Sequence, residues 1–186
     1  MILPIYIYGH PVLRRVTRDI SSDYPNLKEL LDDMYETMNK AEGVGLAAPQ
    51  IGREDRILVV DLDSLAKNDP LLKGFRKAFI NAHIIELDGE DEIMEEGCLS
   101  IPGIHEKVPR KNHLRLQYLD ENLQPHDEVY EGYKARVLQH ELDHLEGIMY
   151  IDRISGIRKQ MIRSKLNRLM EGRTNCSYRV KTMQNR

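Results

Sequence analysis

Residues 139–147 read Gln-His-Glu-Leu-Asp-His-Leu-Glu-Gly, and the rest of the chain is interpreted around this stretch. His140 and His144 are four residues apart, so on a helix both imidazoles leave the same face and can bind one metal ion. Glu141 lies beside them on a helical wheel, where its carboxylate can reach a water molecule on that ion. Taken alone, the pattern fits two histidines on a solvated helix face as well as it fits a metallohydrolase site.

The residues around the two histidines favour the metal site. The apolar side chains of Val137, Leu138, Leu142 and Leu145 give the segment a buried side, and Gly147 is suited to end a helix. We therefore predict a helix over 133–146 that is buried on this side. Histidines at the margin of such a helix need partners, and a metal ion supplies them.

Apolar periodicity predicts two further helices and several strands. Residues 23–42 repeat apolar side chains at intervals of three and four, and residues 155–171 do so with Ser155 as a cap. The predicted buried side of the last helix consists of Ile157, Met161, Leu166 and Leu169. Strands are expected over 57–61, 78–87, 114–118 and 124–130.

Two segments are interpreted as turns. Residues 43–52 are small, apolar and rich in glycine, and by themselves they favour a tight turn before the strand at 57–61. Residues 87–92 form an acidic stretch between two predicted strands, which also indicates a turn.

Composition predicts an ordinary globular protein. Of its 186 residues, 41% are hydrophobic and 31% are charged, which suits one catalytic domain over 1–171. The sequence has no apolar run of about 20 residues and no signal-peptide pattern at its start, so we expect a cytoplasmic protein without a membrane partner. Its two cysteines fit a reducing compartment.

Charge is distributed unevenly along the chain. From Ser155 onward there are nine Lys or Arg against the single acid Glu171, which gives +8 and leaves −11 of the total of −3 for the rest. Residues 172–186 are predicted to form a basic, flexible tail. The basic region either faces a polyanion or is only a solvated face.

A metal ion bound by two histidines requires a third protein ligand. One class of metallopeptidases takes a later histidine, but Tyr150 stands where it would be. No histidine follows His144, and Glu171 lies at the far end of a basic helix. An upstream ligand remains, and Cys98 is the best one because Gly97 lets the backbone turn toward the helix. A metallopeptidase using a downstream acid is the competing interpretation.

Three stretches resemble the signature motifs of peptide deformylases, in the same order and with similar spacing. They are Gly-Val-Gly-Leu-Ala-Ala-Pro-Gln at 43–50, Glu-Gly-Cys-Leu-Ser at 96–100 and Gln-His-Glu-Leu-Asp-His-Leu at 139–145. Tyr-Gly-His-Pro-Val-Leu at 8–13 resembles the amino-terminal segment of that family. Together with the predicted elements, the resemblance implies an α+β fold. In it, mixed, mainly antiparallel sheets pack around a central helix carrying the histidines, and an amphipathic helix follows at the C-terminus.

The resemblance implies a hydrolase that removes the formyl group from the amino-terminal formylmethionine of new polypeptides. Its metal ion would be held by Cys98, His140 and His144, with a fourth position left for water. Glu141 would take a proton from that water and pass it to the departing amine. The family is associated with Fe²⁺, whereas this ligand set by type also suits Zn²⁺, so we expect Fe²⁺ with Zn²⁺ as a substitute.

Further residues follow from the resemblance and from the helical wheel. In the family, the side chain of Gln50 and the backbone N–H of Leu99 meet the negative charge that builds up on the formyl oxygen. The resemblance also implies substrate contacts at Val44, Gly45, Glu96 and Gly97. The helical wheel places three further residues on the histidine face, where they would line the pocket for the methionine side chain: Tyr133, Arg136 and Val137. We expect the charge of Arg136 to be directed toward solvent. The alternative is that Arg136 pairs with an acid elsewhere in the protein.

The expected partners are N-formylmethionyl peptides, nascent chains and, through the basic C-terminal segment, the ribosome. A non-catalytic module that binds nucleic acid or ribosomes through this segment is an alternative of a different class. An enzyme acting on emerging chains would itself gain from docking on the ribosome, so the two ideas are compatible.

Overall fold

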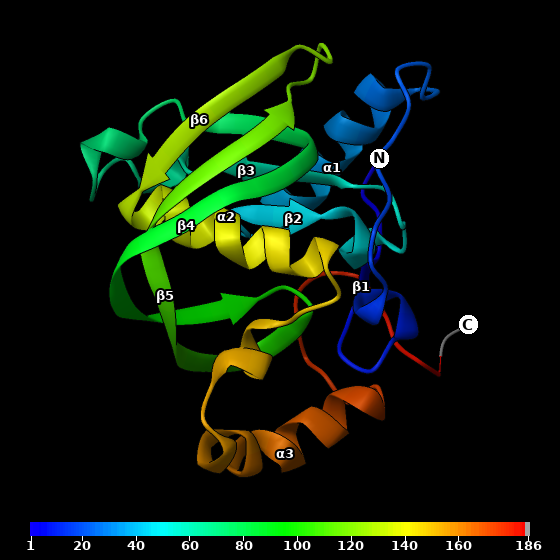
Figure 1. Ribbon diagram of the computed structural model, residues 1–186. Helices are drawn as coiled ribbons and strands as arrows, with labels where there is room; N and C mark the ends of the chain where they lie inside the picture. The colour runs from blue at the N-terminus through cyan, green and yellow to red at the C-terminus, as the bar shows by residue number, and fades with distance from the viewer. Residues whose placement is uncertain (185–186) are drawn as a thin grey trace.

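The computed structural model describes residues 1–184 and contains a central helix enclosed by a curved sheet (Figure 1). The helices are α1 (Leu27–Lys40), α2 (Gly132–Leu145) and α3 (Gly156–Met170). The strands are β1 (Ile5–Tyr6), β2 (Gly45–Ala47), β3 (Ile57–Asp61), β4 (Arg76–Cys98), β5 (Ile101–Leu119), β6 (Pro125–Glu131) and β7 (Val180–Lys181).

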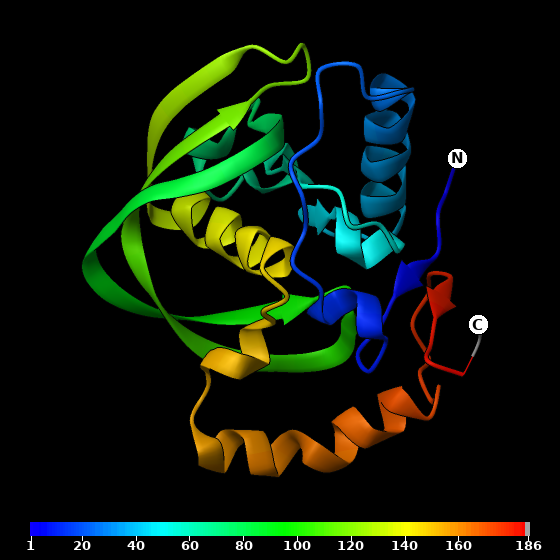
Figure 2. The same ribbon diagram turned by 45° about the vertical axis from the view of Figure 1, so that its right-hand side comes forward.

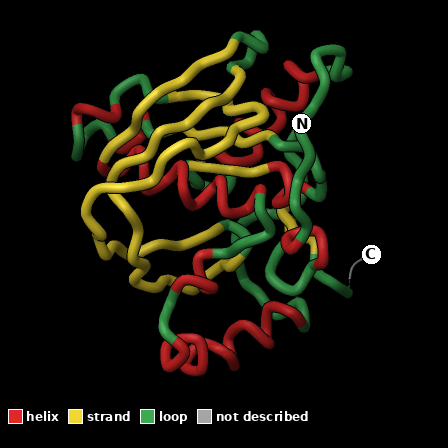
Figure 3. Tube along the Cα trace, in the orientation of Figure 1, coloured by secondary structure: helices red, strands yellow, loops and turns green. Residues whose placement is uncertain are grey.

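The main sheet is antiparallel throughout, with the strand order β2-β3-β4-β5-β6. Strands β4 and β5 form a long ribbon whose pairing is interrupted by four register shifts. Such irregularities bend a strand pair. Figures 1 and 3 show this ribbon curving past α2, so that one part lies above the helix and the other below it. Strands β1 and β7 form a separate parallel pair.

Helix α2 is buried along most of its length. Every residue from Ala135 to Leu145 is buried, because the curved sheet covers the helix on more than one side. Leu138 and Leu142 belong to the same core cluster as Phe79 and Leu116 of the sheet. The polar residues on the side of α2 that faces away from Leu138 and Leu142 are also buried. They are removed from water and need hydrogen-bond partners inside the protein.

Helices α1 and α3 cover two smaller cores. Leu31, Met34 and Met38 of α1 pack with β3 and β4. Helix α1 begins at Leu27 rather than at residue 23, because Asn26 adopts the left-handed conformation with φ 55° and interrupts the helical path.

Helix α3 is capped by Ser155, as predicted, but the predicted buried side is wrong at two positions. Ile157 and Met161 are 75% and 62% exposed, whereas Ile162 is 4% exposed and packs with Leu166 and Leu169. The first turn of α3 contacts β5 through an ion pair between Arg158 and Glu106 at 2.8 Å, whereas its apolar contacts come from Ile162, Leu166 and Leu169. Two apolar side chains in the first half of the helix are therefore left in solvent.

Both predicted turns belong to the sheet. The segment 43–52 contains β2, which forms an edge of the main sheet, followed by a short 3₁₀ helix over Ala48–Ile51. The acidic stretch 87–92 continues β4 and contains a register shift between Asp88 and Asp91. Its charged side chains are exposed, since this part of the ribbon has a solvent side.

The predicted α+β class, with mainly antiparallel strands around the histidine-bearing helix, is confirmed. Within residues 1–184, no helix combines the length and the apolar character needed to cross a bilayer. The predicted tail over 172–186 extends two residues beyond the described chain. Its described part runs beside β1 and contains β7, and its flexibility stays a prediction.

Candidate active site

The three predicted metal ligands come together from two distant parts of the chain. One donor atom from each of Cys98, His140 and His144 lies within 4.8 Å of the others. The Sγ atom of Cys98 is 3.2 Å from Nε2 of His144, and both histidines are buried. A thiolate and two imidazoles are ligands for a transition-metal ion, and their separation suits a single ion.

A tight hairpin positions Cys98. Cys98 ends β4 and pairs with Ile101, the first residue of β5, so that only Leu99 and Ser100 form the turn between the strands. A Cβ atom on Gly97 would lie 2.6 Å from the ring of His105. The glycine before the cysteine therefore permits this ring to pack on the backbone, which sequence reasoning did not foresee.

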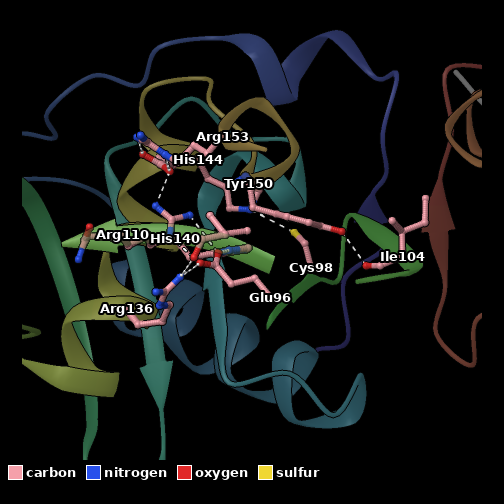
Figure 4. A network of polar contacts seen from close by, with 12 residues as sticks. Glu96, Cys98, Ile104, Arg110, Arg136, His140, His144, Tyr150 and Arg153 are labelled. Carbon is pink, nitrogen blue, oxygen red and sulfur yellow. Dashed lines mark hydrogen bonds and ion pairs between the residues drawn. The ribbon is translucent and has the colours of Figure 1, made fainter. Parts of the chain in front are cut away.

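Glu96 fixes the orientation of His140. Its carboxylate accepts hydrogen bonds from Nδ1 of His140 at 2.7 Å, from Arg110 at 2.6 and 3.0 Å, and from Arg136 at 2.6 Å (Figure 4). Burial alone would raise the pKa of Glu96, but the hydrogen bonds from His140 and Arg110 and their positive charges lower it to about 2. Because Nδ1 of His140 is engaged, its Nε2 remains as the nitrogen for a metal ion.

The prediction for Arg136 is half wrong. Its side chain does line the cavity beside Val137, but its guanidinium is buried and does not face solvent. It donates to Glu96, to the carbonyl of Val108 at 2.7 Å and to the carbonyl of Glu92 at 2.7 Å. Buried charges require such partners, and the nearest carboxylate is the one that orients His140.

Sequence reasoning missed the polar residues behind the histidines. Asp143, inside the motif, accepts hydrogen bonds from Arg110 at 2.8 Å and from Arg153 at 2.6 Å through each of its oxygens. Residues 104, 106, 108 and 110 of β5 alternate with exposed positions and are buried. This period of two was the signal that could have placed Arg110 inside.

Glu141 is buried without a full set of hydrogen bonds. Its Oε2 atom has no hydrogen-bond partner among the described residues, and burial raises its pKa to about 7. A Cβ atom on Gly45 would lie 2.4 Å from Oε1 of Glu141. Gly45 was predicted as a substrate contact, and the structure adds that the absence of a side chain there leaves room for the carboxylate of Glu141.

Gln50 reaches the site from the short helix after β2. Its Oε1 atom accepts from the N–H of Ala47 at 2.9 Å, and its Nε2 atom donates to Oγ of Ser100 at 3.2 Å. The same Nε2 lies 3.5 Å from Sγ of Cys98. The amide is thus oriented with its donor group toward the cysteine turn that also contains Leu99.

A cavity of about 470 Å³ opens onto the site. It is lined by the predicted residues Val44, Gly45, Gln50, Glu96, Gly97, Cys98, Leu99, Tyr133, Arg136, Val137, His140 and Glu141. His144 lies deeper, with 1% of its surface exposed. The lining also contains residues that were not predicted as part of the site, among them His105 and residues 176–178.

Comparison with known proteins links this arrangement to one enzyme family. The family model described as polypeptide deformylase matches residues 2–160. The peptide deformylases of Flavobacterium psychrophilum and Flavobacterium johnsoniae are 47% and 48% identical to the chain, and each alignment covers 97% of the chain and at least 96% of the relative. Among solved structures, Thermus thermophilus peptide deformylase is similar with a TM-score of 0.82 at 38% identity, over 92% of this chain and 99% of that one. A Plasmodium falciparum peptide deformylase in complex with an inhibitor is similar with a TM-score of 0.78 at 34% identity, over 90% of this chain and 99% of that one.

Proposed function

The chain belongs to the polypeptide deformylase family, metal-dependent hydrolases that remove the N-formyl group from nascent polypeptides, and we propose how its own residues carry out this reaction. The observation that carries the proposal is the convergence of the Cys98, His140 and His144 donor atoms beside the buried carboxylate of Glu141. A metallopeptidase would need a downstream ligand, and the cluster contains none.

The metal ion would be held by Cys98, His140 and His144. When bound, a divalent ion supplies Lewis-acid chemistry, because it polarises the formyl carbonyl and lowers the pKa of water. We propose Fe²⁺ on the basis of the family resemblance, with Zn²⁺ as a substitute that the ligand types also suit. The hydrogen bond from His140 to Glu96 supports the assignment, since it presents the opposite ring nitrogen to the ion.

Glu141 is proposed as the residue that moves protons. Its carboxylate would accept a proton from the attacking water and deliver it to the departing amine, which leaves poorly unless it is protonated. Burial raises the pKa of Glu141 above its ordinary value, which favours acceptance of a proton by this carboxylate. Its Oε2 atom is available for this work, since no described residue donates to it.

Gln50 and Leu99 are proposed to stabilise the negative charge on the formyl oxygen. Nε2 of Gln50 already donates toward the turn that carries Leu99, so its donor and the N–H of Leu99 would approach the same oxygen. Donors held in place before the reaction need no reorganisation when charge develops.

The remaining cavity residues are proposed to hold the substrate. The backbone at Val44, Gly45 and Gly97 would pair with the extended peptide. Glu96 would hold the end of β4 beside the peptide, since its carboxylate is bonded to Arg136 and His140 of α2. Tyr133 and Val137 would contact the methionine side chain. Their place in the lining of the cavity supports this assignment.

We also propose a cytoplasmic location and a contact with the ribosome through the basic C-terminal region. In this arrangement, residues 1–171 form the catalytic domain and residues 172–186 form the basic tail, so the basic region that begins at Ser155 includes both α3 and the tail. Four side chains of α3 make no ion pair with any residue in the described part of the chain, which supports a polyanionic partner: Lys159, Arg163, Lys165 and Arg168.

The decisive experiment measures formate release from formyl-Met-Ala and metal content on protein purified without oxygen. We expect iron in the active preparation. Glu141→Ala should lower kcat by about 10²-fold to 10⁴-fold while keeping the metal, because Glu141 is not a ligand. Glu131→Ala, which removes an exposed carboxylate, is the matched control. Undiminished formate release by Glu141→Ala would contradict the proposed role, and activity confined to the zinc form would overturn the assignment of Fe²⁺.

A further inference from the structure

The chain returns to the cavity after α3. Residues 174–182, which we term the C-terminal strap, lie beyond residue 160, where the match to the family model ends. Figure 2 shows this segment rising from the end of α3 to lie beside β1. The N–H groups of Ile5 and Ile7 donate to the carbonyls of Arg179 and Lys181 at 2.9 and 3.0 Å. The strap is therefore attached to the other end of the chain by strand pairing.

Three residues of the strap line the cavity: Cys176, Ser177 and Tyr178. The hydroxyl of Tyr178 donates to the carbonyl of Leu99 at 2.7 Å. Burial raises the pKa of Tyr178 above its ordinary value, so the hydroxyl keeps its proton and remains a donor. The strap is thus hydrogen-bonded to the turn that follows Cys98.

This turn is held from three directions. Tyr178 holds the carbonyl of Leu99, the N–H of Tyr8 donates to the carbonyl of Ser100 at 2.8 Å, and Gln50 donates to the hydroxyl of Ser100. Both ends of the chain consequently meet at a turn whose N–H is proposed to contact the formyl oxygen.

We infer that the C-terminal strap is the wall of the cavity that contacts the substrate residues following formylmethionine, with Tyr178 as its positioning residue. The inference rests on the proposed function, which places the formyl group at the metal ligands and the methionine side chain beside Tyr133 and Val137. A nascent chain continues beyond methionine. The strap lines the cavity on the Leu99 side, from a different part of the chain than α2, and is available to these following residues.

Ser177→Trp tests the wall without disturbing the core, because Ser177 is exposed and yet lines the cavity. We compare formate release from formyl-methionine amide and from the tripeptide formyl-Met-Ala-Ser. The indole should lower kcat/KM for the tripeptide about tenfold and leave that for the amide within about twofold, as expected when bulk fills an occupied site. Ser64→Trp makes the same change at an exposed position outside the cavity and should leave both values unchanged.

Tyr178→Phe tests the anchor and keeps the ring. Loss of one neutral hydrogen bond should lower the ratio of tripeptide to amide kcat/KM about threefold. Tyr24→Phe removes a hydroxyl bonded to Asp55 at 2.8 Å outside the cavity and should leave the ratio unchanged. This ratio does not depend on the fraction of active enzyme, so a partly unfolded variant does not imitate the effect.

The wild-type enzyme separates the two possible failures. If it hydrolyses both substrates and Ser177→Trp retains the wild-type ratio, the strap is not a substrate wall, although the proposed function stands. If the wild-type enzyme loaded with metal releases no formate from either substrate, the proposed function fails and the inference that rests on it fails too.

Discussion

Gly45 and Glu141 occupy one small space at the centre of the site. The glycine lies on the edge strand β2 and the glutamate on α2, and an ideal Cβ on Gly45 would lie 2.4 Å from Oε1 of Glu141. Contacts of this length do not occur between a carbon and an oxygen, so any side chain at residue 45 must displace the carboxylate. The position of the Glu141 carboxylate, which is proposed to transfer the proton, thus depends on the absence of a Cβ atom at residue 45.

We therefore predict that Gly45→Ala lowers kcat for formyl-Met-Ala by about 10-fold to 100-fold while metal content stays at the wild-type level. A displaced carboxylate no longer reaches the water, and misplacement by about 1 Å is enough for losses of this size. Steady-state formate release and metal analysis on the same preparation measure both quantities.

Gly156→Ala is the control, since a Cβ there meets no atom within 4 Å. Its kcat should equal that of the wild type. Full activity in Gly45→Ala would mean that Glu141 adopts another position without loss, which would contradict its proposed role.

The buried face of helix α3 is not the one that its sequence pattern predicted, since Ile157 is exposed and Ile162 is buried. Apolar residues are spread around the helix. Ile162, Leu166 and Leu169 are buried because they join a core cluster with the amino-terminal segment, β5 and residues 149–154. An amphipathic pattern predicts a helix, but it does not identify the face when apolar side chains lie on two sides.

We predict that Ile162→Ala lowers the free energy of unfolding by about 2 to 4 kcal/mol, because it leaves a cavity in a buried cluster. Ile157→Ala removes the same atoms from an exposed side chain and should change the free energy of unfolding by less than about 0.5 kcal/mol. Urea unfolding of both variants, each with the same metal content, provides the comparison. Equal effects of the two substitutions would contradict the observed orientation of α3.

At the scale of the whole molecule, the residues from Ser155 onward carry a net charge of +8 and the rest of the chain carries −11. If α3 docks on the ribosome, reversing two of its charges that form no ion pair with any described residue should weaken the association. We predict that the double variant Arg163→Glu and Lys165→Glu co-sediments with ribosomes at least about fivefold less than the wild type in 50 mM salt. The difference should shrink as the salt concentration rises, because binding to a polyanion releases counterions.

The double variant Lys67→Glu and Lys73→Glu changes the net charge by the same amount at exposed positions between β3 and β4. It should co-sediment like the wild type. Equal loss in both variants would assign the effect to net charge, and no loss in either would remove α3 from the contact.

Local sequence patterns identified the three helices, part of the strands of the main sheet and the class of chemistry, but they missed β2 and the continuous course of β4 through residues 87–92. The spacing of His140 and His144 on a helix and the alternation in β5 and β6 are short-range properties that a chain carries wherever it folds. The cysteine turn was found by elimination of other ligands and by the resemblance of three motifs. These features were therefore accessible before any contact was known.

Contacts between distant residues were decided only by the tertiary structure. The carboxylate of Glu96 was predicted as a substrate contact, but the fold surrounds it with His140, Arg110 and Arg136. The strap reaches Leu99 because β7 pairs with β1 at the opposite end of the chain. Periodicity encodes which side of an element is apolar, whereas the partner of a buried charge depends on which elements pack together. Which elements pack together depends on how the whole chain buries its apolar surface, and the buried polar groups then pair with the groups that this packing brings near.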